Sequence, residues 1–145
     1  MLTRKVLPTA LLLLMAAGLV GEVSAAQQAS TKRVSVDSLG AQGIGDSEGP
    51  SISAHGRFVA FYSSAANLVG SDTNGARDVF VRDRKTGKTA RVSVDSHGAQ
   101  GNGDSEGPSI SADGRFVAFY SFASNLVAGD TNAAGDVFVR GPLHP

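Results

Sequence analysis

The chain contains nearly the same sequence twice, 58 residues apart, and this repeat restricts its fold more than any other feature. Residues 31–82 align without a gap on residues 89–140, and 42 of the 52 aligned positions are identical. Such a repeat is typical of a supersecondary unit whose copies stack and bury each other's apolar faces. We therefore expect two similar units, residues 31–88 and 89–145, with most candidate site residues present in both.

The first 25 residues have the pattern of a secretory signal peptide. Arg4 and Lys5 precede an apolar run over residues 9–20, and Val23-Ser24-Ala25 supplies the small residues before a cleavage site. The apolar run is shorter than the roughly 20 residues that span a bilayer. We expect cleavage after residue 25, a periplasmic or secreted location in a bacterium, and no membrane contact after cleavage.

The composition of the mature segment, residues 26–145, excludes several classes of function. It carries 11 basic and 12 acidic side chains, so its charge gives no reason to expect nucleic acid as a partner. The absence of cysteine excludes disulfides, thiolate chemistry and cysteine-based metal sites. An exported chain of this kind must be held together by its apolar core.

Each repeat contains four short segments with the alternation of β-strands, and no mature segment keeps a helical period. In the first repeat they cover residues 33–37, 50–54, 57–62 and 78–82, and the second repeats them 58 residues later. The last two segments are apolar on both faces, which requires cover on both sides. The pair Asp113-Gly114 predicts a two-residue hairpin turn with positive φ at both residues, which His55 in the first repeat suits less well.

Repeated four-stranded antiparallel units with two apolar faces predict an all-β fold of two propeller blades, a partial propeller. A β-sandwich also explains the alternation but not the gapless repeat. Residues 141–145 contain no counterpart of the strand that follows the turn at residues 84–88. We therefore expect the second blade to lack its own outermost strand, and residues 32–37 to form a spare strand at the start.

A longer motif carries a family resemblance. Residues 111–119 read S-A-D-G-R-F-V-A-F and are followed by S-N-L-V, D-T-N and D-V-F-V-R; the first repeat differs in this motif by having His55 in place of aspartate. The pattern resembles the TolB-like, WD-repeat-like propeller blades of exported bacterial proteins and covers residues 31–140. The resemblance implies a propeller fold but no particular activity, because that fold carries unrelated functions.

The resemblance also implies a closed ring of six to eight blades, whereas this sequence contains two. Three outcomes follow from the mismatch. Several copies join head to tail into a ring, each spare strand completing a neighbouring blade. Alternatively, the two blades form an open pair with exposed apolar faces, or the sequence is a truncated remnant of a longer propeller.

Acidic side chains gather on one predicted rim of the blades. They lie in or beside the glycine-rich loops at residues 38–49 and 96–107, and loops on a rigid scaffold often carry binding sites. We expect this acidic rim to bind a protein, peptide or glycan, although simple solvation of turns explains the same charges. The candidate binding residues are Asp46, Glu48, Asp104 and Glu106.

Two further loops have the alternating Asp and Asn side chains that offer oxygen ligands to Ca²⁺. They lack the bidentate glutamate of an EF-hand loop, and Asx turns account for the same residues without a metal. Calcium is therefore a candidate cofactor, with no other cofactor expected. The candidate ligands are Asp72, Asn74 and Asp78 in the first repeat and Asp130, Asn132 and Asp136 in the second.

No catalytic residues are predicted. Residues 45–50 read G-D-S-E-G-P, which is similar to the nucleophile motif of chymotrypsin-like proteases, but the serine occurs in both repeats and none of the three histidines does. We expect a non-catalytic binding or interaction module, completed by oligomerisation. The alternatives are a remnant of a larger propeller, a propeller accessory part of a hydrolase system, and a calcium-binding repeat protein.

Overall fold

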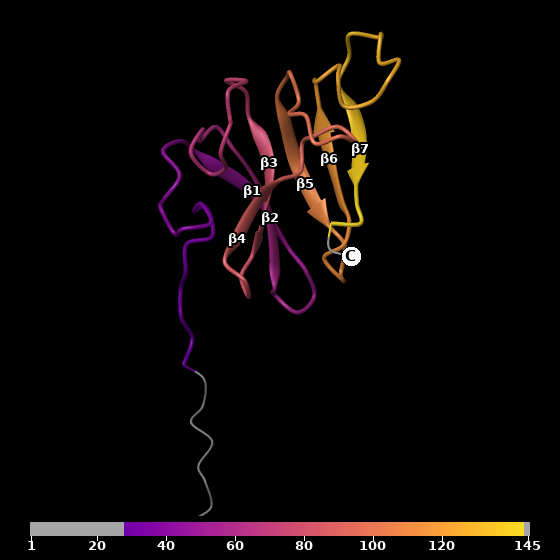
Figure 1. The fold of residues 1–145 in the computed structure, drawn as a ribbon. Coiled ribbons are helices and arrows are strands. Elements are labelled where there is room, and N and C mark those ends of the chain that lie inside the picture. The colour runs from indigo at the N-terminus through magenta and orange to yellow at the C-terminus, as the bar shows by residue number, and fades with distance from the viewer. Residues whose placement is uncertain (1–27, 144–145) are drawn as a thin grey trace, which may run out of the picture. The chain divides into compact units, whose positions relative to one another are not determined.

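The computed structural model describes residues 28–143, so the predicted signal peptide lies outside the described residues. As the sequence predicts, the described chain is all-β: it contains no helix, and its strands form two antiparallel sheets (Figure 1). Both sheets belong to one compact unit, Lys32–Pro145. The first sheet contains, in spatial order, β1 (Ser47–Ile52), β2 (Phe58–Ser63), β3 (Asp78–Asp83) and β4 (Lys88–Arg91). The second contains β5 (Ser105–Ile110), β6 (Val117–Ser121) and β7 (Asp136–Arg140).

The sheets are partial propeller blades of four and three strands, so the second has no outermost strand within the described residues. Each is a meander in which every strand pairs with the next along the chain. Both first strands contain a register shift at equivalent places, between Glu48 and Ser51 and between Glu106 and Ser109. The proline of the G-P pair cannot donate a ladder hydrogen bond, which accounts for an irregularity at this point.

The prediction of a strand at residues 33–37 was wrong. Apart from an isolated bridge between Val36 and Gln42, this segment has no strand structure. The carboxylate of Asp37 accepts hydrogen bonds from the N–H groups of Leu39 and Ala41, both at 2.8 Å, and this turns the chain back on itself. The equivalent residues 91–95 form the same turn, and the fourth strand of the first sheet, Lys88–Arg91, overlaps them only at Arg91.

The turn between the first two strands of each sheet also differs from the predicted type. Only the glycines have positive φ, at +65° for Gly56 and +76° for Gly114. In both turns the N–H of the glycine donates to a serine carbonyl three residues earlier, Ser53 or Ser111. Since the residue before the glycine keeps a negative φ, His55 fits this turn as well as aspartate does.

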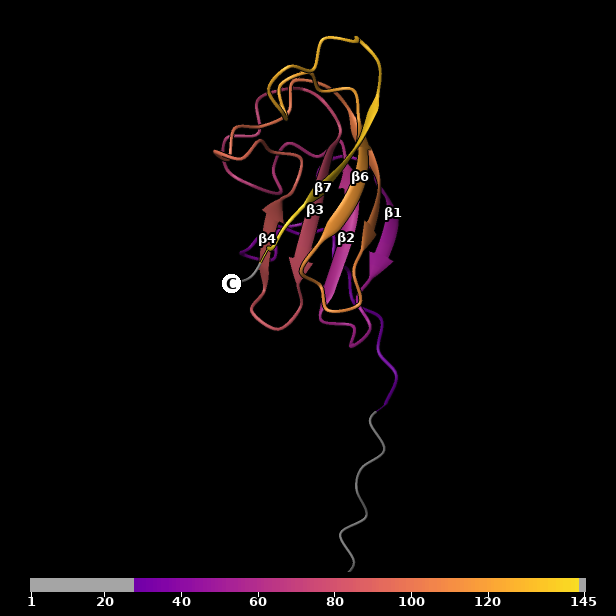
Figure 2. The same cartoon turned by 90° about the vertical axis from the view of Figure 1, so that its right-hand side faces the viewer.

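The two sheets pack face to face. Figure 2 shows β6 and β7 lying over β2 and β3. Apolar side chains from both sheets, with Val92 of the connecting loop, form one buried cluster. Gly114 packs so closely on this cluster that a Cβ there would lie 2.1 Å from the Phe58 ring. The members from the first sheet are Phe58, Ala60, Val79 and Val81, and those from the second include Ile110, Val117 and Phe119.

The other face of the first sheet is covered by its own loops. The rings of Phe61 and Phe80 stack with centroids 5.8 Å apart, and Ala65, Leu68 and Val69 of the β2–β3 loop pack on them. The first sheet therefore has cover on both faces, as its apolar strands require.

The second sheet has cover on only one face. Val79 is 0 % exposed, whereas its equivalent Val137 is 76 % exposed. Val81 is 3 % exposed and its equivalent Val139 is 68 % exposed. The side chains of the second sheet that correspond to those buried between the sheets are thus exposed to solvent, on the face that points away from the first sheet. We call this surface, formed by Phe116, Tyr120, Val137 and Val139, the open face.

The repeat supplies a matched test of this difference. We expect Val79→Ala to lower the free energy of unfolding by about 2 kcal/mol, because it removes buried methyl groups and leaves a cavity. Val137→Ala makes the same chemical change on the open face and should cost less than about 0.5 kcal/mol. Urea unfolding at dilute protein concentration measures both values, and equal losses would contradict the assignment of covered and open faces.

Candidate functional site

Two loops of nearly identical sequence precede the two sheets. Each starts with an arginine whose guanidinium donates to a glutamine side chain later in the loop, Arg33 to Gln42 and Arg91 to Gln100. Each also contains a bridge between a valine and the same glutamine. We call residues 33–44 the first arginine loop and residues 91–102 the second arginine loop.

Each arginine loop rests on the sheet that follows it through the same bonds. The amide of Asn67 donates to the Gln42 carbonyl at 2.9 Å, and Asn125 donates to the Gln100 carbonyl at the same distance. Arg82 and Arg140 donate to the carbonyls of Asp37 and Asp95. The two loops therefore have the same conformation, and each is held to the sheet that follows it by the same hydrogen bonds.

The second arginine loop also binds the sheet that precedes it. Arg91 Nη2 lies 3.1 Å from Asp72 Oδ1, and Arg91 Nε lies 3.4 Å from Asp78 Oδ2. The three side chains are only 7 %, 5 % and 0 % exposed. A buried cation thus sits between two buried carboxylates, at the place where one repeat meets the next.

Hydrogen bonds complete this contact. The Ser93 hydroxyl donates to Asp78 Oδ1 at 2.5 Å and accepts from the Val79 N–H at 3.1 Å. The Asn74 amide donates to Asp78 Oδ2 at 3.0 Å and to the Gly101 carbonyl at 2.9 Å. Asp72, Asn74 and Asp78 therefore form a receptor for the second arginine loop, which we call the first socket.

Burial sets the charge balance of the first socket. It raises the pKa of Asp78, and the hydrogen bond from Ser93 and the charge of Arg91 oppose that rise. Burial likewise raises the pKa of Asp72, against the charge of Arg91. The charge of Arg91 favours the ionised form of both buried carboxylates. Their negative charges in turn compensate for the burial of the guanidinium.

The second sheet has an equivalent second socket, formed by Asp130, Asn132 and Asp136. Its loop has the same internal bonds, because the Asn132 amide donates to Asp136 Oδ2 at 3.1 Å and the Ala134 N–H donates to Asn132 Oδ1 at 2.9 Å. Within residues 28–143, no cation pairs with either carboxylate. A pocket of about 370 Å³ opens here instead, and Asp130, Asn132, Asp136 and Val137 line it.

These two sockets are the loops predicted to hold calcium. In the first, the Arg91 guanidinium lies between the carboxylates, so a metal ion would have to displace it. Among the described residues, no three Asp, Glu, His or Cys side chains converge closely enough to hold a metal ion. Calcium binding stays a prediction, and Asx turns account for the observed hydrogen bonds in both loops.

The predicted acidic rim divides into two pairs with different surroundings. Asp104 and Glu106 meet Arg77, which comes from the loop before β3: the Arg77 N–H donates to Asp104 Oδ1 at 2.8 Å, and its guanidinium pairs with Glu106. This pair therefore joins the two sheets.

Asp46 and Glu48, the equivalent pair in the first repeat, lie exposed. Glu48 Oε2 accepts a hydrogen bond from the Tyr62 hydroxyl at 2.8 Å, and this bond raises the pKa of Tyr62. The residue that corresponds to Arg77 in the second repeat is Gly135. Binding of a protein, peptide or glycan to the acidic rim stays a prediction.

The serines of the protease-like motif have structural partners. Ser47 Oγ donates to Ser63 Oγ at 3.0 Å, and Ser105 Oγ lies 2.8 Å from Ser121 Oγ. The Ser63 and Ser121 hydroxyls in turn accept from the N–H groups two residues later. These hydroxyls therefore tie strand ends together.

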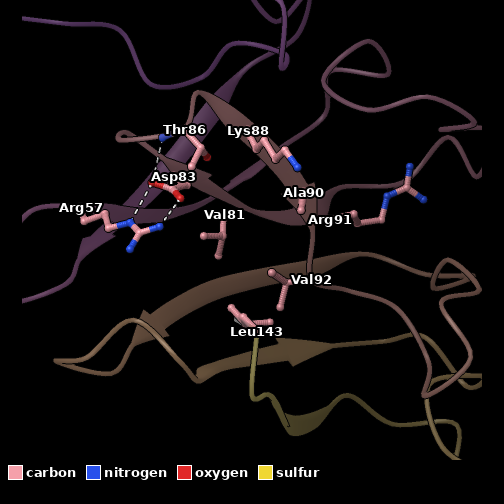
Figure 3. A pocket seen from close by; sticks show the side chains of 9 residues that line it. All are labelled: Arg57, Val81, Asp83, Thr86, Lys88, Ala90, Arg91, Val92 and Leu143. Carbon is pink, nitrogen blue, oxygen red and sulfur yellow. Dashed lines mark hydrogen bonds and ion pairs between the residues drawn. The ribbon is translucent and has the colours of Figure 1, made fainter. Parts of the chain in front are cut away.

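A pocket of about 360 Å³ lies between the first sheet and the C-terminal segment (Figure 3). Asp83 accepts two hydrogen bonds from Arg57, at 2.8 and 3.1 Å, on one wall of this pocket. Figure 3 shows Leu143 pointing toward Val92 on the other side. The remaining lining residues are Val81, Thr86, Lys88, Ala90 and Arg91.

No family model matches this chain, and no curated protein matches it either. Within the described part of the chain, no helix is long and apolar enough to cross a membrane.

Sequence reasoning found the acidic members of both sockets but missed the arginine that binds the first. The alternation over residues 33–37 and 91–95 predicts strands, and a strand gives no reason to bring Arg91 to the socket aspartates. The available signal was the recurrence of Arg33, Gln42 and both socket aspartates at the same positions in both repeats.

The buried pair gives a prediction with an internal control. Arg91→Met leaves two buried carboxylates without a cation and should lower the free energy of unfolding by about 3 kcal/mol. Arg33→Met, at the equivalent position, touches no carboxylate and should cost less than about 0.5 kcal/mol in the dilute chain. Denaturant unfolding of both variants checks this. Equal losses would show that the carboxylates of the first socket do not depend on Arg91.

The Arg57–Asp83 pair predicts a dependence on pH. The hydrogen bond from Arg57 holds the pKa of Asp83 well below its usual range, so this carboxylate stabilises the fold at neutral pH. That contribution is present above the unfolded pKa of about 4 and is lost as the pH falls toward the lowered folded value. Arg57→Met should therefore lower the melting temperature at neutral pH, and its difference from the unaltered protein should shrink as the pH falls below about 4.

Arg115→Met is the control for this experiment. Arg115 is the equivalent arginine, but Gly141 stands where the first repeat has Asp83, and no carboxylate pairs with Arg115 within residues 28–143. We expect Arg115→Met to leave the dependence of the melting temperature on pH unchanged below about pH 4. A pH-dependent loss as large as that of Arg57→Met would rule out the ion pair as its cause.

Proposed function

We propose that this protein is an exported, non-catalytic interaction module of the TolB-like, WD-repeat-like propeller type, and that it binds a partner sheet through its open face. The blade motif over residues 111–119 and the signal pattern over residues 1–25 support the family and the location. The two stacked sheets fit the propeller type. Binding adds a blade to the stack.

The open face is the observation that carries this proposal. Its valines and aromatic residues are of the same types as their counterparts in the first sheet, which pack between the two sheets. On the open face these side chains are exposed to solvent. Burying one valine side chain contributes about 1.5–3 kcal/mol, so two of them already provide a driving force for association. Contiguous exposed apolar surface on a soluble protein usually marks an interaction site.

The shape of the required partner follows from the covered side of the second sheet. There, Ile110, Val117 and Phe119 fill the face formed by Phe58, Ala60, Val79 and Val81. A partner for the open face needs a sheet with a similar apolar row, which a further blade provides. The interaction therefore extends the packing that already joins the two sheets.

A single substitution tests the proposal. Val139→Glu places a charge on the open face, where Val139 is 68 % exposed, and association of the mature chain, measured by sedimentation velocity over a concentration series, should weaken at least tenfold. Lys85→Glu is the control, because it adds negative charge at an exposed residue of the turn between β3 and β4, outside the open face and both arginine loops. The proposal fails if the chain stays monomeric at high concentration or if Val139→Glu leaves association unchanged.

A further inference from the structure

We infer that the partner of the open face is a second copy of this chain, whose first arginine loop enters the second socket as the second arginine loop enters the first. This inference rests on the proposed function and names its partner and register. Each copy would then present a loop at one end and a socket at the other, so copies join head to tail.

The first arginine loop carries the groups that this contact uses. Arg33 corresponds to Arg91, Val34 to Val92 and Ser35 to Ser93. The Arg33 guanidinium donates to Gln42 as the Arg91 guanidinium donates to Gln100. Unlike Arg91, however, Arg33 is exposed and pairs with no carboxylate among the described residues. The loop is thus preformed in its binding conformation, which lowers the entropic cost of docking.

The second socket carries the complementary groups. Asp130 and Asp136 correspond to the two aspartates that bind Arg91, and Asn132 corresponds to the asparagine that donates to Gly101. The pocket beside these residues gives the guanidinium a place to enter. In the first sheet the backbone N–H of Val92 also donates to the Val79 carbonyl at 2.7 Å, and Val34 can make the same bond to Val137.

The apolar surfaces continue this register. Ile110 is 9 % exposed because it lies against the first sheet, whereas its equivalent Ile52 is 59 % exposed. When the first arginine loop of one copy occupies the second socket of another, Ile52 comes to the open face in the position that Ile110 holds inside the chain. Docking therefore covers Ile52 at one end of the two-sheet stack and the open face at the other.

The sheet edge fits the same arrangement. In the first sheet β4 pairs with β3, with Arg91 opposite Phe80 and Ala90 opposite Val81. The outer edge of β7 pairs with no strand within residues 28–143. Residues 30–33 correspond to β4, so they add to β7 with Arg33 opposite Phe138 and Lys32 opposite Val139. An incoming strand on an open edge is a known mode of recognition.

One difference makes the contact between copies weaker than the contact within the chain. Arg77 ties the first sheet to Asp104 and Glu106, but Gly135 replaces it in the second repeat. The joint between two copies therefore lacks this ion pair, and Glu48 of the incoming copy keeps its hydrogen bond to Tyr62. We expect assembly to be reversible and to depend on concentration.

A charge swap tests the register. Arg33→Asp and Asp130→Arg should each weaken self-association of the mature chain at least tenfold, because each places like charges together in the joint. The double variant restores opposite charges between copies and should recover most of the affinity. Sedimentation velocity measures association, and the melting temperature of dilute protein confirms that each variant folds.

A mixture tests the polarity. A chain with Arg33→Asp keeps a working socket, and a chain with Val139→Glu keeps a working loop. Each alone should stay monomeric, but an equimolar mixture should form a dimer that contains one copy of each and grows no further, as measured by light scattering. Growth beyond the dimer, or no complex in the mixture, would overturn head-to-tail docking.

The outcomes separate this inference from the function on which it rests. If Val139→Glu abolishes association while Arg33→Asp and Asp130→Arg leave it unchanged, the open face binds a sheet but the loop does not enter the socket. If the unaltered chain never associates, both proposals are wrong. Loss in both single charge variants and recovery in the double variant supports both.

Discussion

Both faces of each sheet carry apolar side chains, so each face needs cover, and most other features follow from this requirement. The β2–β3 loop covers the outer face of the first sheet, and its inner face, with Phe58, Val79 and Val81, packs against the apolar row of the second sheet. The loops that connect the sheets are then held close to the strand ends. The socket, the arginine loop and the acidic rim owe their positions to the stacking of two sheets with nearly identical sequences.

The buried guanidinium fixes which surfaces of two neighbouring sheets meet. Apolar packing alone tolerates sliding, since valine and isoleucine rows fit one another in several registers. Arg91 removes that freedom, because only one position of the second arginine loop puts the cation between Asp72 and Asp78. A buried ion pair adds little net stability, but leaving its carboxylates without a cation is costly, so the pair selects one register over the others.

The sequence predicted the parts of the fold that depend on periodicity, and it failed where side chains bond to the backbone. The strands at residues 57–62 and 78–82 were predicted within one residue of β2 and β3, because their apolar pattern is continuous. Residues 33–37 show the same alternation, yet Asp37 captures two backbone N–H groups and bends the chain into a loop. The sequence also predicts the socket aspartates as a cluster of oxygen ligands. It does not predict their partner Arg91, which lies at the end of β4, where the second arginine loop begins.

The identity of the partner cannot be argued from the apolar residues alone, since a duplicated sequence copies its buried residues whether or not the copy is buried. The loops carry more information. Within the 52 aligned positions, none of the ten differences between the repeats falls in β2 or β3, and one of them replaces Arg77, which ties the two sheets together, by Gly135. The arginine, the glutamine and the socket residues are unchanged, although within the described residues Arg33 pairs with no carboxylate and the second socket pairs with no cation. A cation with no carboxylate at one end and two carboxylates with no cation at the other complement each other, and this charge pattern favours another copy of the chain over an unrelated apolar surface.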